Sequence, residues 1–141
     1  MSTRLRKTLS VFAIIVVAIS LLTACGSAQG KVDITLGIFK IDMPSTVKAG
    51  QVTFHVTNSD SSDTHEFVIF KTDLAAGKLP LDSSNNVDET AQSLTKIGEI
   101  PDMAPGDVKT LTVTLQPGNY VAICNLPGHY QAGMYAGFTV E

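Results

Sequence analysis

The chain has 141 residues, of which 44% are hydrophobic and 16% are charged, so it has the length of one domain and enough apolar content to bury a core. Its formal net charge is −3, and the residues after position 24 hold seven basic and thirteen acidic groups, a net charge of −6. This acidic body lacks the basic face that nucleic-acid binding needs. The chain contains two cysteines, which excludes a fold held together by several disulfides.

The N-terminus has the pattern of an export signal. Basic residues at positions 4, 6 and 7 precede an apolar run over 9–24, which ends in Leu22-Thr23-Ala24-Cys25. These four residues resemble a bacterial lipobox, so residues 1–24 are predicted to be a lipoprotein signal peptide and Cys25 the lipidated mature N-terminus. The alternative is a retained membrane anchor, since the run has about the length of a short spanning helix. Both interpretations predict a lipid- or helix-anchored domain outside the cytoplasm, in the periplasm or on the outer face of the cytoplasmic membrane.

Beyond the signal, the hydrophobic period is that of strands. Residues 25–30 are small and polar and form a flexible tether, and the domain is expected over 31–141. Apolar and polar residues then alternate or form short dense runs, which predicts strands near 32–38, 52–57, 65–70, 110–115, 120–124 and 138–140. Short strands between turn signals indicate an all-β fold, a Greek-key antiparallel β-sandwich.

One long segment interrupts the strands. Residues 71–98 are too many for a hairpin loop, and we interpret them as an excursion between two strands. Within it, 88–96 begins with Asp88 and Glu89 and ends with Lys96, the charge order that a helix dipole favours. The excursion is therefore expected to contain one short helix.

The residues with metal-binding chemistry gather near the C-terminus. Cys124, His129 and Met134 have the spacing C-x4-H-x4-M, and Pro127-Gly128 is expected to turn the chain so that His129 faces the Cys124 sulfur. A thiolate, an imidazole and a thioether together favour copper, and a trigonal His2Cys set with a weak axial Met is a blue-copper arrangement. The alternative is a lone buried cysteine near an unrelated histidine, with Met134 packed in the core.

A second histidine is needed, and His55 and His65 are the two that remain. Strand alternation places His55 on the side of Thr53 and Thr57, which faces outward. His65 follows a polar loop and opens the apolar run over 67–70, at an end of the sandwich where one metal ion can be shared with the loop of Cys124. His65 is therefore the preferred candidate.

Other chemistries fit these residues less well. A binuclear copper site needs a second loop cysteine, and a multicopper oxidase needs more than three histidines. A Cys–His hydrolase would use Cys124 as nucleophile and His129 as base, but leaves Met134 without a role. Zinc accepts methionine poorly as its fourth ligand, although ligand preference alone does not exclude zinc from the site.

With these residues identified, the chain resembles the cupredoxins, the small blue-copper proteins that include plastocyanin, azurin, rusticyanin and sulfocyanin. The resemblance covers roughly 31–141 and rests on His65-Glu66-Phe67, on Pro127-Gly128-His129 and on the four-residue gaps of the ligand loop, which look most like the rusticyanin and sulfocyanin type. It implies one copper ion, Cu(I) or Cu(II), with equatorial ligands His65, Cys124 and His129 and axial ligand Met134. One position departs from plastocyanin and azurin, because Glu66 stands where they carry an asparagine that ties the two ligand loops together.

The resemblance also implies a role. The protein would be a one-electron carrier rather than an enzyme, a monomer that docks on redox proteins such as cytochromes or copper oxidases. His129 would be the electron port, with Leu126, Pro127 and Tyr130 in the surface around it. Two alternatives stay open: a chaperone or storage protein that transfers copper without redox cycling, and a non-redox assembly module on a degenerate sandwich.

Overall fold

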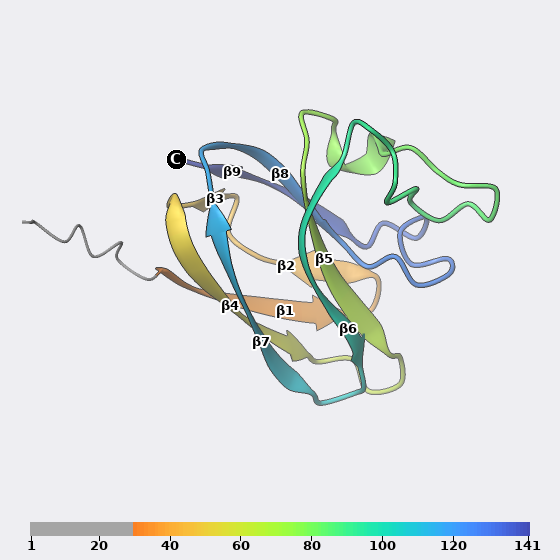
Figure 1. Ribbon diagram of the computed structural model, residues 1–141. Coiled ribbons are helices and arrows are strands. Elements are labelled where there is room, and N and C mark those ends of the chain that lie inside the picture. Colours follow the sequence, from red (N-terminus) through yellow and green to blue (C-terminus); the bar gives the residue numbers. More distant parts are fainter. Residues whose placement is uncertain (1–29) are drawn as a thin grey trace, which may run out of the picture.

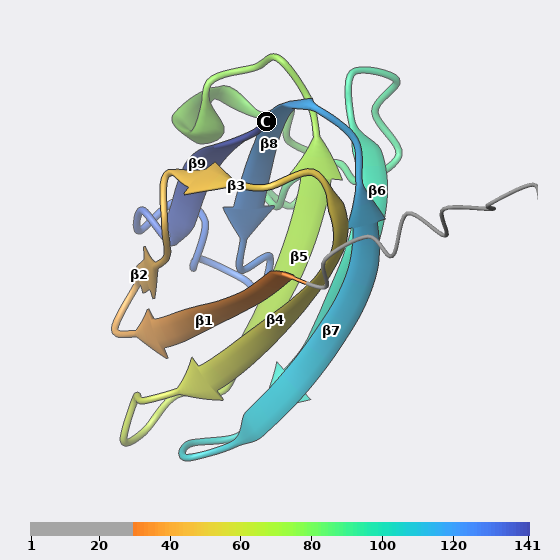
Figure 2. The same cartoon turned by 90° about the vertical axis from the view of Figure 1, so that its left-hand side faces the viewer.

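Over residues 30–141, the part of the chain that the computed structural model describes, nine strands form two facing sheets (Figures 1 and 2). The first sheet has the order β2 (Lys40–Asp42), β1 (Gly30–Gly37), β4 (Gly50–Asn58) and β7 (Val108–Leu115). The second has the order β3 (Thr46–Val47), β9 (Tyr135–Val140), β8 (Gly118–Ile123), β5 (His65–Lys71) and β6 (Thr95–Met103). The all-β sandwich expected from the alternation is confirmed.

The sheets are mixed rather than wholly antiparallel. β1 pairs in parallel with β4, and β3 pairs in parallel with β9, whereas the other strand pairs between these elements are antiparallel. A parallel pair needs a connection that crosses back. The segment that holds β2 and β3 provides this connection between β1 and β4, because it passes from one sheet to the other (Figure 2).

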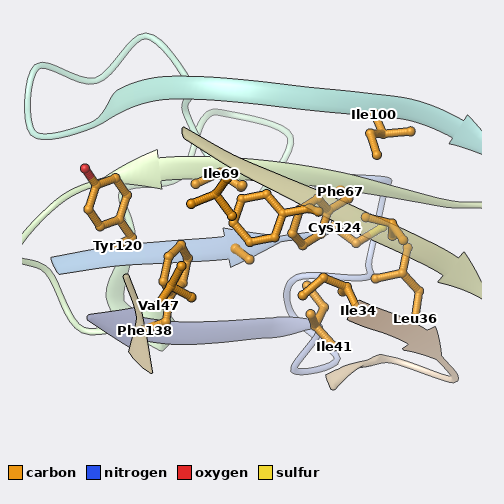
Figure 3. Close-up of a cluster of buried hydrophobic side chains, with 14 of the residues drawn as sticks. Ile34, Leu36, Ile41, Val47, Phe67, Ile69, Ile100, Tyr120, Cys124 and Phe138 are labelled. Atoms are coloured by element: carbon orange, nitrogen blue, oxygen red, sulfur yellow. The ribbon is translucent and has the colours of Figure 1, made fainter. Parts of the chain in front are cut away.

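The space between the sheets is filled by the main hydrophobic core. Its centre is aromatic, since the Phe54 ring of β4 lies 5.8 Å from the Phe67 ring of β5 and 6.4 Å from the Phe138 ring of β9. Figure 3 shows Tyr120 and Phe138 toward one end of this core and Cys124 toward the other. The cysteine of the candidate site is therefore a core residue that continues β8.

A second core explains why β5 is apolar at successive positions. Phe67 and Ile69 face the main core, whereas Val68 and Phe70 belong to a separate buried cluster on the outer side of the same sheet. The excursion between β5 and β6 covers this side with three buried residues, Leu79, Val87 and Leu94 (Figure 1). Because both faces of β5 are buried, its sequence is a continuous hydrophobic run.

The excursion contains one short helical element, as expected, but its predicted position over 88–96 is wrong. The element is a 3-10 turn, η1 (Ala76–Lys78), whereas 88–94 forms consecutive turns before β6 begins at Thr95. The Asp88 carboxylate accepts hydrogen bonds from the backbone N–H and the hydroxyl of Thr90, at 3.0 and 2.6 Å, and such local bonds compete with a helix. Lys96 pairs with Glu89 and Glu99, so the charge order reflects ion pairs and not a helix dipole.

The predicted signal peptide, Cys25 and the predicted tether as far as residue 29 lie outside the described residues, and the first strand starts at Gly30. From Gly30 to the C-terminus, no helix combines the length and the hydrophobicity that crossing a bilayer requires.

Candidate metal centre

Three side chains from different parts of the sequence meet at one end of the sandwich. Nδ1 of His129 lies 3.2 Å from Nδ1 of His65 and 3.2 Å from Sγ of Cys124. The potential ligand atoms of the three residues all lie within 4.8 Å of one another. His65 opens β5, Cys124 follows β8, and His129 stands in the loop between β8 and β9. Two nitrogens and one sulfur therefore converge on one point, which suits a single metal ion.

The loop from Cys124 to Met134 is held by its own backbone hydrogen bonds. The N–H of His129 donates to the carbonyl of Leu126, that of Met134 to the carbonyl of His129, and that of Cys124 to the carbonyl of Met134, at 3.0, 3.0 and 3.1 Å. Gly128 and Gly133 have φ angles of +84° and +102°, which side-chain-bearing residues rarely adopt. These turns keep Met134 next to Cys124 in a loop only eleven residues long, and the Met134 side chain is fully buried.

The Cys124 sulfur lies in a dry environment. It is fully buried and accepts a hydrogen bond from the backbone N–H of Glu66 at 3.4 Å. Burial raises the pKa of the Cys124 thiol, and this effect outweighs the opposing backbone hydrogen bonds of Glu66 and Leu126. The sulfur is thus a thiol at neutral pH unless a metal ion displaces its proton.

His129 is the ligand candidate nearest to solvent. Its side chain is half-buried, whereas His65 and Cys124 are fully buried. Burial, and then the neighbouring His65, lower the pKa of His129, so its ring is neutral at pH 7 and able to bind a metal. The ring of Phe39, from the turn between β1 and β2, meets His129 edge-on at 5.4 Å.

A buried carboxylate lies behind His65. Oδ2 of Asp60 is 3.1 Å from Nε2 of His65, and neither side chain is exposed. Oδ1 of Asp60 accepts bonds from the backbone N–H and the hydroxyl of Ser62 and from the N–H of Asp63. The pKa of Asp60 is lowered to about 2, above all by the backbone hydrogen bond of Ser62 and further by His65. Asp60 is therefore ionised, and Nε2 of His65 carries the proton between them.

Glu66 ties the two ligand segments together. Its carboxylate Oε1 accepts a hydrogen bond from the backbone N–H of Asn125 at 2.7 Å, and its own N–H reaches the Cys124 sulfur. Glu66 therefore joins the segment of His65 to the segment of Cys124 with a carboxylate in place of the asparagine of plastocyanin and azurin. Burial is the main cause that raises the pKa of Glu66, and nearby Glu99 and Glu89 raise it further.

Tyr130 does not belong to the exposed surface where we expected it. It is only 6% exposed, because its ring packs in the second core. Its hydroxyl donates to the carbonyl of Ala76 at 2.7 Å and accepts from the N–H of Leu79 at 3.0 Å. Tyr130 thus fastens the loop of Cys124 and His129 to the excursion. The ring can be buried in an apolar cluster because both backbone partners satisfy its hydroxyl group.

The surface next to His129 has a different composition from the expected one. Pro127 is exposed and Leu126 half-buried. Phe39, in contact with His129, is 39% exposed, and its neighbour Ile38 is 70% exposed. Ile38, which we placed in a strand, lies in the turn after β1 ends at Gly37. The turn between β1 and β2 contributes an apolar contact to His129 that the sequence pattern did not indicate.

His55 lies apart from the cluster. It is in the middle of β4, on the same side as Thr53, where both line a shallow surface hollow with Gly30 and Lys31. Alternation along the strand correctly separated it from His65.

A model of the copper-binding proteins of the plastocyanin/azurin family matches residues 30–141. The chain belongs to this family. None of the curated proteins compared with the chain matches it.

Several solved cupredoxin structures share the fold. Auracyanin A, a "blue" copper protein of Chloroflexus aurantiacus, is 26% identical over 79% of this chain and 100% of its own, with a TM-score of 0.56. The dithionite-reduced auracyanin of Roseiflexus castenholzii is 24% identical over 81% of this chain and 98% of its own, with a TM-score of 0.59. Rusticyanin of Thiobacillus ferrooxidans is 15% identical over 81% and 79%, with a TM-score of 0.58.

The donor set of this cupredoxin fits the copper of its family. A ring nitrogen of His65, a ring nitrogen of His129 and the Cys124 sulfur lie close together. Met134 is buried at the end of the loop that carries Cys124 and His129. One soft thiolate, two imidazoles and a thioether match the preference of copper better than that of zinc or of hard cations. These four residues provide a plausible site for one copper ion.

Two residues at the site escaped the sequence analysis. Asp60 stands in a run of aspartates and serines that has the composition of a solvated turn. Its surroundings depend on tertiary contacts, since it bonds to His65 and to Asn58, and Asn58 is in turn bonded to Met103 of β6. Phe39 is 90 residues away from His129 along the chain, and only the fold brings them together. The departure at Glu66 was visible in the sequence, but its bond to Asn125 was not.

Proposed function

We propose that this cupredoxin is an extracytoplasmic one-electron carrier, with copper bound by His65, Cys124, His129 and Met134, rather than an enzyme. The observation that carries the proposal is the meeting of His65, Cys124 and His129 within 4.8 Å at one buried point of a rigid sandwich. Bound copper supplies a single electron by cycling between Cu(I) and Cu(II). An enzyme would in addition need a substrate cleft at the site.

The chain's own residues give the site its rigidity. Strand β5 fixes His65, the backbone of Glu66 holds the Cys124 sulfur, and the hydrogen bonds of the loop fix His129. Ligands that are fixed beforehand do not rearrange when the metal changes its oxidation state, and this lowers the barrier to electron transfer.

His129 is the proposed electron port, because it is the one of the three converging side chains that reaches solvent. Phe39, Leu126 and Pro127 lie around it as apolar neighbours, and Tyr130 supports the loop from inside. A small apolar surface favours brief encounters with redox proteins such as cytochromes or copper oxidases, and we propose that the carrier acts as a monomer.

The carrier is proposed to be held at the membrane by lipid on Cys25. The Leu22-Thr23-Ala24-Cys25 pattern supports this, and two acyl chains bind a membrane much more firmly than one. Mass spectrometry of the protein extracted from membranes should find acyl groups on Cys25 and no residue before it. An intact N-terminus would instead indicate a retained anchor.

Voltammetry of the copper-loaded protein tests the carrier function. The expected result is a reversible one-electron wave that persists over many cycles with the copper retained, and no wave from Cys124→Ser. A copper-loaded protein that gives no reversible wave, but releases Cu(I) to an acceptor protein, would contradict the carrier and indicate a copper chaperone.

A further inference from the structure

A carboxylate buried beside a histidine needs an explanation beyond packing. Asp60 and His65 are both closed off from solvent, with Oδ2 and Nε2 at 3.1 Å. An ionised carboxylate in the interior is costly unless hydrogen bonds and a partner compensate for its lost hydration. The chain supplies such bonds in the loop between β4 and β5.

This loop is organised around the carboxylate. Three donors of Ser62 and Asp63 are directed at Oδ1 of Asp60, which leaves Oδ2 for His65 alone. The N–H of Asp60 donates to Oδ1 of Asn58, and Nδ2 of this fully buried asparagine donates to the carbonyls of Asp63 and Met103. The loop is thereby fixed to β4 and β6, so the position of the carboxylate is set by the fold.

The carboxylate determines which nitrogen of His65 faces the site. An ionised Asp60 can only accept a hydrogen bond, so Nε2 of His65 must be the donor. With Nε2 engaged by the carboxylate, Nδ1 is the ring nitrogen left to bind a metal, and it lies 3.2 Å from Nδ1 of His129. A carboxylate behind a ligand histidine fixes the ring and increases its electron donation to a metal.

We propose that Asp60 is a positioning residue of the copper site, which holds His65 with Nδ1 toward the metal and lowers the reduction potential of the copper through its buried negative charge. The inference rests on the proposed function. A negative charge near the metal is attracted more strongly by the two positive charges of Cu(II) than by the single charge of Cu(I). The buried carboxylate therefore stabilises Cu(II) more than Cu(I).

The potential of Asp60→Asn, measured in the full copper-loaded protein, tests the charge. Asparagine has nearly the same shape and no charge, so the preference for Cu(II) should fall at least tenfold, which raises the potential by about 59 mV for a one-electron couple. Ser62→Ala is the matched control, because it removes one hydrogen bond to Asp60 and keeps the carboxylate. Its potential should stay close to that of the unchanged protein. An unchanged or lower potential in a folded, copper-retaining Asp60→Asn protein overturns the proposal.

Nitrogen NMR of the His65 ring keeps the proposal testable if Asp60→Asn does not fold. In the unchanged protein, both metal-free and loaded with Cu(I), Nε2 of His65 should carry a proton that exchanges slowly with water. An unprotonated Nε2 overturns the proposal. Failure of the carrier function is a separate outcome, because it would remove the reversible wave of the unchanged protein and leave the metal-free NMR measurement intact.

Discussion

Burial moves three ionisable side chains near the site toward their neutral forms. It is the main cause that raises the pKa of the Cys124 thiol, raises that of Glu66 and lowers that of His129. Asp60 is the exception, because the donors of Ser62 and Asp63 outweigh its desolvation and lower its pKa to about 2. At the residue scale, the site therefore combines a neutral histidine at its surface, a protonated thiol in its interior and one permanent charge behind His65.

The raised pKa of Cys124 predicts how copper affinity depends on pH. Between pH 7 and 8 the metal-free thiol is protonated and His129 is already neutral, so binding releases one proton from sulfur. Copper affinity should increase about tenfold for each pH unit in this range. Competition with a chelator of known affinity at several pH values measures the slope. A flat profile would show that the sulfur is already a thiolate before copper binds.

At the scale of elements, the excursion between β5 and β6 supports the ligand loop from outside. Tyr130 bonds to Ala76 and Leu79, and the side chain of Asn125 bonds to the N–H and the carbonyl of Val87. Each of these loop residues directly follows a candidate ligand, His129 or Cys124. The long excursion thus covers the outer core of β5 and also restrains the loop that carries most of the site (Figure 1).

The Tyr130 hydroxyl should contribute measurably to stability. Tyr130→Phe removes the partner of two backbone groups in the excursion, and an unsatisfied buried polar group costs about 1–3 kcal/mol. Chemical unfolding of the metal-free protein measures this loss. Tyr135→Phe is the control, because the Tyr135 ring packs against Tyr130 but is 36% exposed, and it should change stability by less than about 0.5 kcal/mol. Equal effects of the two substitutions would argue against the anchoring role.

Glu66 offers a second test of how the elements are joined. Glu66→Ala removes the acceptor of the Asn125 N–H, and changes of this kind near metal ligands lower metal affinity about 10- to 100-fold. Glu66→Gln keeps an oxygen acceptor and should restore most of the affinity. Copper titrations of both variants distinguish the hydrogen bond from the charge. If Glu66→Gln binds copper as weakly as Glu66→Ala, the affinity depends on the negative charge of Glu66 and not on its hydrogen bond to Asn125.

At the scale of the whole molecule, the acidic body bears on partner choice. Seven basic and thirteen acidic residues follow position 24, and surface charge steers encounters over a distance that falls from about 30 Å at 0.01 M salt to about 8 Å at 0.15 M. Electron transfer to a cationic cytochrome, followed by stopped flow, should slow as salt increases. An anionic partner should show the reverse trend, and a salt-independent rate with the cationic partner would contradict steering.

The sequence predicted those parts of the sandwich and of the site that depend on local patterns along the chain. Alternation along the chain gave the strands and separated His55 from His65, and the spacing of Cys124, His129 and Met134 indicated one loop. Features that depend on tertiary packing were missed or wrong, because local composition does not determine them. The 88–96 segment has the charge order of a helix, but Lys96 forms ion pairs with two glutamates instead. Tyr130 is buried by the excursion, which is distant in the sequence. Asp60 stands in a run typical of a solvated turn, yet it is buried against His65.

The visible absorption spectrum of the copper-loaded protein tests the central claim most directly. If His65, Cys124 and His129 bind copper together, Cu(II) should produce an intense visible band from thiolate-to-copper charge transfer, and Cys124→Ser should abolish it while His55→Ala keeps it. A folded, copper-replete protein without this band, or with a band that survives Cys124→Ser, would contradict the account.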